Sequence, residues 1–132
     1  SLHGGLMKKT INYARKHINP KLGNGSQYIN WIHIEDLCRI FVHIIEQSIY
    51  GVYNAVATEK NKNVDFTKSV SRILQKPNLS PSIPSFFLKI VFGEMASILL
   101  YGSRVSNDKI KKTDYTFKFD QLDSALKNLL IK

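Results

Sequence analysis

The stretch NWIHIEDLCRIFVHIIE, residues Asn30 to Glu46, changes its hydrophobic period partway along. Its first part, taken with the two residues before it, alternates as a short extended segment does. From Asp36 onward, apolar side chains recur at spacings of three and four, which predicts a helix over about 35–47 with one buried face. The apolar positions of that face are Leu37, Ile40, Phe41, Ile44 and Ile45.

Upstream of this stretch, residues 6–18 place apolar side chains at helical spacing with basic residues between them. The pattern predicts a basic amphipathic helix that ends at Asn19 and Pro20. KLGNGSQY, residues 21–28, is predicted to form a turn, because Gly23 and Gly25 can adopt positive φ. The apolar positions of the helix are Leu6, Ile11, Ala14 and Ile18.

Downstream, GVYNAVA at residues 51–57 is a β-prone run followed by the polar loop TEKNKN. The run predicts one strand that is buried on both sides. Such a strand needs neighbours, and the chain has few other convincing strands. Part of the sheet is therefore expected to be missing from this chain.

The region from residue 63 to residue 102 is predicted to be mainly helical. Asn63 is expected to cap a helix that runs through Gln75. Three prolines in NLSPSIPS, residues 78–85, predict a stiff connector. Pro84 then opens an apolar helix that Gly102 closes, and the apolar residues of this helix cover more than one face.

The C-terminal region is predicted to add two helical pieces and one strand. SRVSNDKIKK, residues 103–112, is expected to hold one helical turn, and YTFKF, residues 115–119, a short strand. Asp120 and Asp123 resemble a capping box at the start of a last helix. Together the predicted elements give an α+β fold that is mostly helical.

The length of 132 residues suits one domain with one core, so residues 1–132 are interpreted as a single domain. The first methionine is Met7 and no basic-then-apolar leader precedes it, so Ser1 is interpreted as a cut end and the chain as a fragment. The longest apolar stretch is interrupted by charge and falls short of the roughly 20 residues that span a bilayer. No membrane partner is expected.

The cysteine and the histidines of the sequence indicate the cellular compartment and whether a metal site is expected. Cys38 is the one cysteine, which fits a reducing cytoplasm. No second cysteine stands at metal-ligand spacing, and the histidines at positions 3, 17, 33 and 43 are scattered. No metal site is predicted.

The charge favours an anionic partner, because 19 lysines and arginines face 10 acidic residues and give a net charge of +9. One hypothesis is a basic nucleic-acid-binding module, whose affinity would fall steeply as salt rises. We rank it low because its basic clusters lack interleaved aromatic residues. Another hypothesis is a protein-interaction domain or homo-oligomer that docks through residues 85–101 and 51–57. The candidate nucleic-acid contacts are Lys8, Lys9, Arg15, Lys16, Lys109, Lys111 and Lys112.

Three local motifs have both a chemical and a structural interpretation. His33 beside Glu35 and Asp36 has the composition of an acid-base site, but two carboxylates at a helix start also interact favourably with the helix dipole. We favour the structural interpretation. The sequence GNG is more simply a turn than a phosphate cradle. Arg104 is either a phosphate-binding guanidinium or a surface arginine, and its sequence context does not decide between them.

Five segments, taken in order, resemble the C-terminal part of the epimerase-like short-chain dehydrogenase/reductases. More narrowly, they are similar to the nucleoside-diphosphate-sugar epimerase-like subfamily, whose C-terminal region is often catalogued as a domain of unknown function. The segments are GNGSQYINWIHIEDLCRIFVHIIE, GVYNAVA, NVDFTKSVSRILQKP, FGEMASILLYGSRV and KIKKTDYTFKFDQLDSALKNLL. The order of WIHIEDL, GVYNAVA, GEMASILLYGSRV and the final Phe-x-Phe makes the resemblance specific.

The resemblance implies an N-terminal Rossmann domain with a TGxxGxxG loop for NAD or NADP and a catalytic Tyr-x-x-x-Lys pair. Neither motif occurs in these 132 residues. The chain is therefore expected to be the substrate-binding lobe plus one late strand of the Rossmann sheet. Alone it is expected to lack catalytic and cofactor-binding residues, and its expected partner is the missing Rossmann domain.

The resemblance also implies candidate substrate contacts, for a phosphorylated sugar or nucleotide-sugar ligand. In related sugar-nucleotide epimerases, an Arg-Asp pair beside the substrate cleft helps to hold the diphosphate, and here those positions are Ile29 and Asn30. Arg104 resembles the later arginine that reaches the substrate phosphate in that family. The other candidates, as pocket wall or hydrogen-bonding groups, are Gln27, Trp31 and His33.

Overall fold

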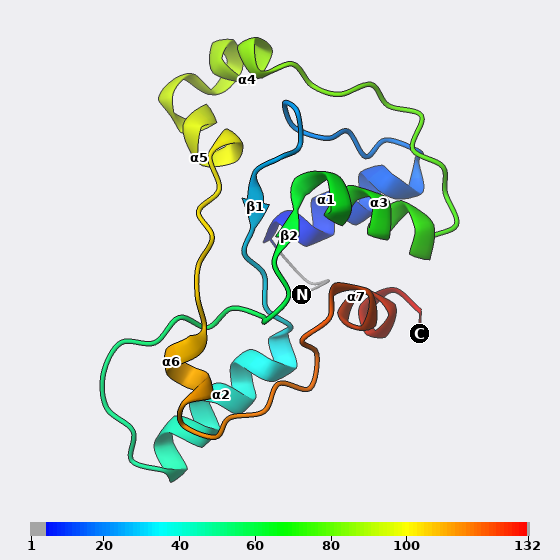
Figure 1. Cartoon of the computed structure of the whole chain (residues 1–132). Coiled ribbons are helices and arrows are strands. Elements are labelled where there is room, and N and C mark those ends of the chain that lie inside the picture. The colour runs from blue at the N-terminus through cyan, green and yellow to red at the C-terminus, as the bar shows by residue number, and fades with distance from the viewer. Residues whose placement is uncertain (1–4, 132) are drawn as a thin grey trace.

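The computed structural model describes residues 5–131, apart from the side chains of residues 5–9, 92, 95, 98 and 99. This part of the chain is mostly helical and contains a two-stranded sheet (Figure 1). In chain order the elements are α1 (Gly5–Arg15), β1 (Tyr28–Ile29), α2 (Ile34–Glu46), β2 (Asn61–Lys62), α3 (Asn63–Ile73), α4 (Ser85–Phe92), the 3-10 helix η1 (Gly93–Met95), α5 (Ala96–Leu100), α6 (Asp108–Lys111) and α7 (Leu122–Leu130).

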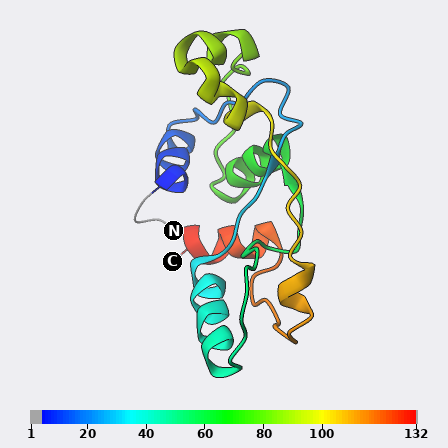
Figure 2. The same ribbon diagram turned by 90° about the vertical axis from the view of Figure 1, so that its left-hand side faces the viewer.

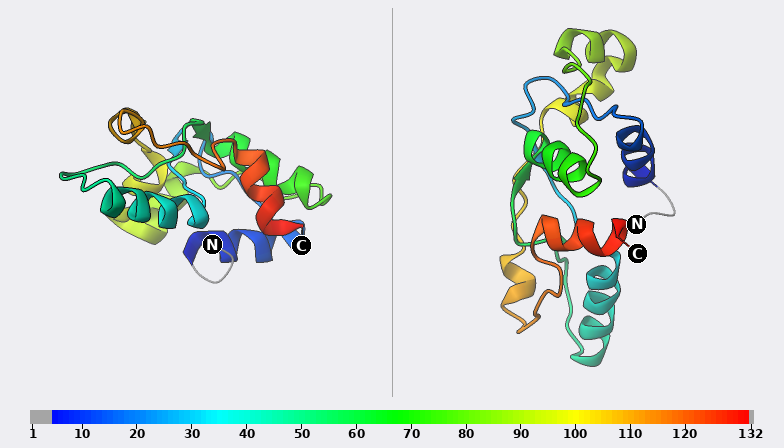
Figure 3. Two further views of the ribbon diagram at one scale, coloured as in Figure 1. Left: turned by 90° about the horizontal axis from the view of Figure 1, so that it is seen from below. Right: turned by 90° about the vertical axis from the view of Figure 1, so that its right-hand side faces the viewer.

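The elements lie in three groups along the long direction of the molecule. Helices α4 and α5 form one end, α2 and α6 form the other, and the sheet with α1, α3 and α7 lies between them (Figure 1). The same order is visible from the side (Figure 2) and from a further side view (Figure 3). Of the helices that the structure describes, none is long and apolar enough to cross a membrane.

The middle group holds the first of two cores. Ala14 of α1, Phe66 and Val70 of α3, and Leu122 and Leu126 of α7 are buried against one another. Burial of each large apolar side chain contributes about 1.5–3 kcal/mol. The apolar positions of α1 and α7 are thus the ones that pack on α3.

The second core lies in the group formed by α2 and α6. Ile40 of α2, Ile110 of α6 and Tyr115 are its buried members. Partly buried side chains surround them, namely Ile32, Ile44, Tyr53, Ala55 and Phe117. The described residues thus form two small cores where the length of the chain suggests one.

The short antiparallel sheet fixes the turn before β1 against the start of α3. Tyr28 pairs with Lys62 and Ile29 with Asn61. Beyond the ladder, the Val64 N–H donates to the Gly25 carbonyl at 3.0 Å. Gly25 has φ of +74°, a conformation that glycine adopts at no steric cost, so the predicted turn is confirmed.

Gly102 allows a late segment of the chain to run along β1. A Cβ placed on Gly102 would lie 2.0 Å from the Tyr28 carbonyl oxygen, which no side chain can tolerate. Next to it, the Asn30 side chain donates to the Ser103 carbonyl at 2.9 Å and accepts from the Val105 N–H at 3.4 Å. The residues on both sides of Arg104 are therefore tied to Asn30.

The predicted strand at residues 51–57 is wrong for the described chain. These residues form no strand, and Val52 is 85% exposed. Ala57 alone in this run is buried, and its N–H donates to the Trp31 carbonyl at 2.8 Å. A doubly buried strand requires neighbouring strands, and the described residues provide none beside this run.

The predicted strand at residues 115–119 is also wrong, although its alternation is real. Tyr115 and Phe119 are buried, whereas Thr116 and Lys118 are exposed. The backbone N–H groups of Lys118 and Phe119 donate to the Asp36 carboxylate instead of a partner strand. A side chain has thus taken the place of a β ladder.

The apolar helix predicted between Pro84 and Gly102 is interrupted. Gly93, the first residue of η1, has φ of +56° and ends α4. Phe86 and Phe87 on α4 are exposed, so the described residues do not cover this helix on both sides. The single helical turn predicted within residues 103–112 is confirmed as α6.

Two predicted caps are replaced by contacts from elsewhere in the chain. The Asn63 side chain accepts from the Leu22 N–H at 3.0 Å and does not cap α3. At α7, the Leu122 N–H donates to the Glu59 carboxylate, so Glu59 serves the role predicted for Asp120. Asp123 instead forms an ion pair with Arg72 of α3. Long-range packing has overridden the local capping pattern.

The predicted helices at 6–18 and 35–47 are confirmed as α1 and α2, with part of each apolar face turned outward. Ile18 lies beyond the end of α1 and is exposed. On α2, Ile40 is buried, but Phe41 is 61% exposed and Ile45 is 75% exposed. The described chain therefore leaves two of the five predicted apolar positions of α2 exposed.

Candidate functional site

Asp36 joins the start of α2 to the 115–119 segment and is fully buried. Its carboxylate accepts from the N–H groups of Lys118 and Phe119, both at 2.8 Å, and from the Tyr115 hydroxyl at 3.1 Å. Arg39, three residues further along α2, lies 3.6 Å from the same carboxylate. The oxygens of the Asp36 carboxylate are therefore occupied by hydrogen-bond donors of the fold. This supports the structural interpretation of Asp36.

Tyr115 is the side chain most affected by this carboxylate. Burial raises the pKa of Tyr115 to about 12, and the charge and hydrogen bond of Asp36 act in the same direction. The Tyr115 hydroxyl also donates to the Asp36 carbonyl at 3.0 Å. A protonated phenol is therefore built into the contact between α2 and the C-terminal segment.

His33 is the N-cap residue of α2. Its Nδ1 accepts from the Glu35 N–H at 3.2 Å, and its ring lies 4.0 Å from the Phe119 ring, measured between centroids. Among the described residues, the buried Nε2 has no hydrogen-bond partner. Burial lowers the pKa of His33, against the opposing carboxylates of Asp36 and Glu35. His33 is thus a buried, neutral capping group.

Trp31 and Gln27 lie on either side of β1 and hold its surroundings together. Trp31 Nε1 donates to the Asn61 side-chain oxygen at 2.7 Å. The buried Gln27 side chain donates to the Leu22 carbonyl at 3.2 Å. Their assignment to the wall of a substrate pocket stays a prediction.

Arg104 lines a pocket of about 390 Å³ between the loop after residue 57 and α6. The pocket is formed by Thr58, Lys60, residues 104–108 and Lys111. Burial lowers the pKa of Lys60, and the positive charges of Arg104 and Lys111 lower it further, opposed by Asp108. The pocket therefore gathers three cations and one carboxylate.

Of the four residues predicted from the sequence, Arg104 alone lines this pocket. Gln27, Trp31 and His33 lie elsewhere around β1 and the start of α2. The sequence does not predict Lys60 as a site residue, because this lysine lies in a polar loop with no periodicity, and it places Lys111 only within a basic cluster. Their proximity to Arg104 depends on long-range contacts that no local pattern encodes.

A larger pocket, of about 510 Å³, lies against α2. Its lining includes Glu35, Cys38, Arg39 and His43, and the His43 Nε2 is 2.9 Å from the Thr113 carbonyl oxygen. Cys38 is a free thiol on the surface. The described side chains contain no group of three or more histidine, cysteine or acidic residues able to hold a metal ion.

Comparison with known proteins identifies the class of this fold. Residues 83–129 match the family described as Domain of unknown function (DUF1731), and nearly the whole chain is homologous to epimerase family proteins. The chain is thus a relative of the epimerase family proteins, which confirms the resemblance drawn from its motifs.

The particular relatives include epimerase family protein SDR39U1 of Homo sapiens, which is 33% identical over 129 residues, covering 96% of this chain and 44% of the relative. Epimerase family protein SAR0825 of Staphylococcus aureus is 31% identical over 133 residues, covering 100% of this chain and 44% of the relative. The chain therefore spans less than half the length of the curated relatives it matches.

The crystal structure of human epimerase family protein SDR39U1 (isoform 2) with NADPH has the same fold over the matched region. The TM-score is 0.87 at 33% sequence identity, and the match covers 95% of this chain and 43% of that chain. The present chain corresponds to the C-terminal part of that structure.

Proposed function

We propose that this chain is the substrate-binding C-terminal part of an NAD(P)-dependent epimerase or reductase and is not catalytic by itself. The observation that carries the proposal is the structural match, with a TM-score of 0.87, to a protein solved with NADPH of which this chain covers 43%. The remaining part would be a Rossmann domain that holds the dinucleotide. Its Tyr-x-x-x-Lys pair would move the proton while nicotinamide exchanges a hydride.

The uncovered surface of α2 supports a missing sheet domain as the partner. Phe41, Val42 and Ile45 present exposed apolar side chains on this helix. The N–H groups of residues 52–56 make no hydrogen bond with the described part of the chain. An apolar helix face next to an extended segment whose N–H groups lack partners is what remains when a helix and its strand are separated from a sheet.

The substrate would be a phosphorylated sugar or a nucleotide sugar held near Arg104. Support comes from the pocket in which Arg104 stands with Lys60 and Lys111. In this proposal Gln27, Trp31 and His33 shape the protein around β1 and the start of α2, and they do not transfer protons. The reducing cytoplasm suggested by the lone cysteine is part of the same proposal.

The reading frame upstream of Ser1 tests the proposal directly. We expect it to encode TGxxGxxG after a β-prone run and then Tyr-x-x-x-Lys before Ser1. A start codon close upstream, with neither motif, would overturn the assignment to an NAD(P)-dependent enzyme.

A further inference from the structure

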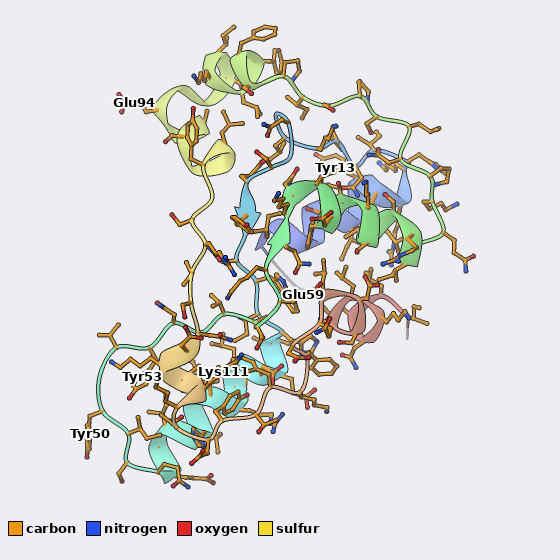
Figure 4. The ribbon with its side chains drawn as sticks, viewed as in Figure 1. Tyr13, Tyr50, Tyr53, Glu59, Glu94 and Lys111 are labelled. Atoms are coloured by element: carbon orange, nitrogen blue, oxygen red, sulfur yellow. The ribbon has the colours of Figure 1, made fainter. Side chains whose placement is uncertain are left out.

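Helices α4 and α5, with η1 between them, form a unit over residues 85–100 that packs mainly on itself. Leu88 of α4 and Ala96 of α5 are its buried members. The unit forms one end of the molecule, opposite α2 (Figures 1 and 2). Figure 4 shows Glu94, between the two helices, pointing away from the rest of the molecule. Among the described elements, none covers the outer side of this unit.

The outer side of α4 carries a row of large apolar side chains. Phe86 is 66% exposed, Phe87 53%, Ile90 75% and Val91 55%, and these four residues are called the α4 patch. Side chains four residues apart lie in one row along a helix, so the patch consists of two adjacent rows. A helix that is apolar on most of its sides is normally buried. The patch therefore calls for a partner.

The size of the α4 patch suits an interface between two proteins. The exposed parts of its four side chains amount to roughly 300–500 Å². A monomeric protein rarely exposes a contiguous apolar patch of more than a few hundred Å². Each partner of a standard interface buries about 800 Å², of which about 65% is apolar in a homodimer. The α4 patch thus supplies most of the apolar area that a stable dimer needs.

The charge of this unit favours a second copy of the chain over an anionic partner. Residues 85–100 contain one lysine, Lys89, and one acid, Glu94, so their charges cancel in a chain of net charge +9. The basic clusters lie in the other groups of elements, with Arg15 on α1 and Lys109 on α6. Two copies can therefore approach through this end with little repulsion. A membrane-binding helix, by contrast, is rich in lysine and arginine beside its apolar face.

Lys89 and Glu94 are both exposed, and neither belongs to the ion pairs of the described chain. Lys89 borders the α4 patch, because it lies three residues after Phe86 on the same helix. A two-fold axis next to Val91 would place Lys89 of each copy opposite Glu94 of the other. In such an isologous contact the same surface is used twice, so both pairs form together.

We propose that the α4 patch is the interface of a homodimer, in which α4 packs antiparallel on α4 of a second copy, with reciprocal ion pairs between Lys89 and Glu94. The four apolar side chains form the centre of the contact and the charged pairs form its rim. The inference goes beyond the proposed function and does not rest on it. The surface proposed for the sheet domain lies on α2 and residues 52–56, toward the other end of the molecule (Figure 1).

Sedimentation equilibrium of the full 132-residue chain tests the dimer. We expect a monomer–dimer equilibrium with a dissociation constant of about 100 μM or tighter. Phe86→Ser should weaken the dimer at least about tenfold, because each dimer loses two aromatic side chains from the centre of its interface. A chain that stays monomeric up to about 1 mM would overturn the proposal.

The matched control is Phe41→Ser, which removes a phenylalanine of similar exposure, 61% against 66% for Phe86, from α2. We expect this variant to keep the dissociation constant of the dimer within about twofold. Equal or greater weakening by Phe41→Ser would overturn the proposal, because the chain would then associate through α2. Both positions are exposed, so the far-ultraviolet circular dichroism of each variant should match that of the unchanged chain.

An exchange of charges tests the two-fold arrangement without removing any apolar contact. Lys89→Glu alone and Glu94→Lys alone should each weaken the dimer at least about tenfold, because both ion pairs become repulsive. A mixture of the two variants should form dimers again, since one variant is acidic and the other basic at both positions. If the unchanged chain dimerises but the mixture does not, the proposed dimer is wrong.

Two other occupants of the α4 patch give different results, and either result would overturn the proposal. A membrane is the occupant if the chain is monomeric and sediments with vesicles of phosphatidylcholine and phosphatidylserine, and if Phe86→Ser abolishes this binding. A domain encoded upstream is the occupant if the protein from the complete reading frame is monomeric and Phe86→Ser lowers its melting temperature. A dimer of that longer protein, weakened by Glu94→Lys, supports the proposal.

Discussion

The carboxylate of Asp36 and the hydroxyl of Tyr115, 79 residues apart in the chain, are 3.1 Å apart in the fold. This contact ties the first turn of α2 to the segment that leads into α7. Because Asp36 also accepts two backbone N–H groups, one side chain fixes the path of residues 115–119. Asp36 is therefore central to the stability of the fold.

Asp36→Asn should destabilise the fold by roughly 2–4 kcal/mol, because the buried N–H groups of Lys118 and Phe119 would lose a charged acceptor. Urea unfolding measures the change. Glu35→Gln is the matched control, since the pair it forms with Lys118 is exposed and should contribute less than about 1 kcal/mol. Equal effects of the two variants would contradict the structural role of Asp36.

Tyr115 should make the fold sensitive to alkaline pH. Its pKa is about 12 in the folded chain, against about 10 for an unfolded tyrosine. Its contribution is complete below pH of about 10 and is lost as the pH rises toward about 12, because the unfolded state releases the proton first. Tyr115→Phe should weaken the alkaline loss of stability, measured by urea unfolding across this range. An unchanged alkaline profile would show that Tyr115 is not responsible.

His33 should produce the opposite dependence at mildly acidic pH. Its folded pKa lies below the ordinary value of 6.5, so the unfolded state takes up the proton first as the pH falls. The contribution of His33 to the free energy of unfolding should be complete above pH 6.5. It should decrease as the pH falls toward the folded pKa of His33. His33→Asn keeps a capping side chain and should flatten the melting temperature over this range. A parallel decrease in the variant would assign the effect to other groups.

Gly102→Ala should destabilise the chain by at least about 2 kcal/mol, because the added methyl group meets the Tyr28 carbonyl. Gly93→Ala is a useful comparison, since nothing lies within 4 Å of the added Cβ there and only its positive φ is strained. That strain costs roughly 1–2 kcal/mol. Urea unfolding of the two variants measures the difference, and equal losses of stability would contradict the close approach of Gly102 to Tyr28.

The isolated chain should neither oxidise NADPH nor bind it tightly, because the proposed dinucleotide site lies in the part of the relatives that this chain does not cover. Calorimetry and absorbance of the reduced nicotinamide measure the two properties. Micromolar affinity for NADPH in these 132 residues would contradict the proposal that the dinucleotide site lies outside this chain.

The sequence predicted elements that are determined locally. The helical periodicity around Ile40 and Val70 and the glycines of the turn at Gly25 correspond to real elements, because each depends on neighbours within a few residues. The two predicted strands failed, since pairing depends on what lies opposite. The backbone of the YTFKF run donates to the carboxylate of Asp36. The GVYNAVA run has no neighbouring strand in the described chain.

The candidate site was predictable only in part. Arg104 was inferred from its resemblance to a family position, and the structure adds Lys60 and Lys111 beside it. Asn30, which differs from the residue expected in sugar-nucleotide epimerases, holds the backbone around Arg104. A positioning contact of this kind joins a side chain to main-chain atoms distant in sequence, so residue types alone do not reveal it.

The N–H groups of residues 52–56, which donate no hydrogen bond within the described chain, can report the assembly of this chain with a sheet. Amide hydrogens without acceptors exchange with solvent deuterium rapidly, while those in a β ladder are protected. Docking of a parallel sheet onto this segment would convert fast-exchanging amides into slow ones without any change in the rest of the fold. Mass spectrometry of the peptide that carries Val52 and Tyr53 would thus register the docking of a sheet onto this segment.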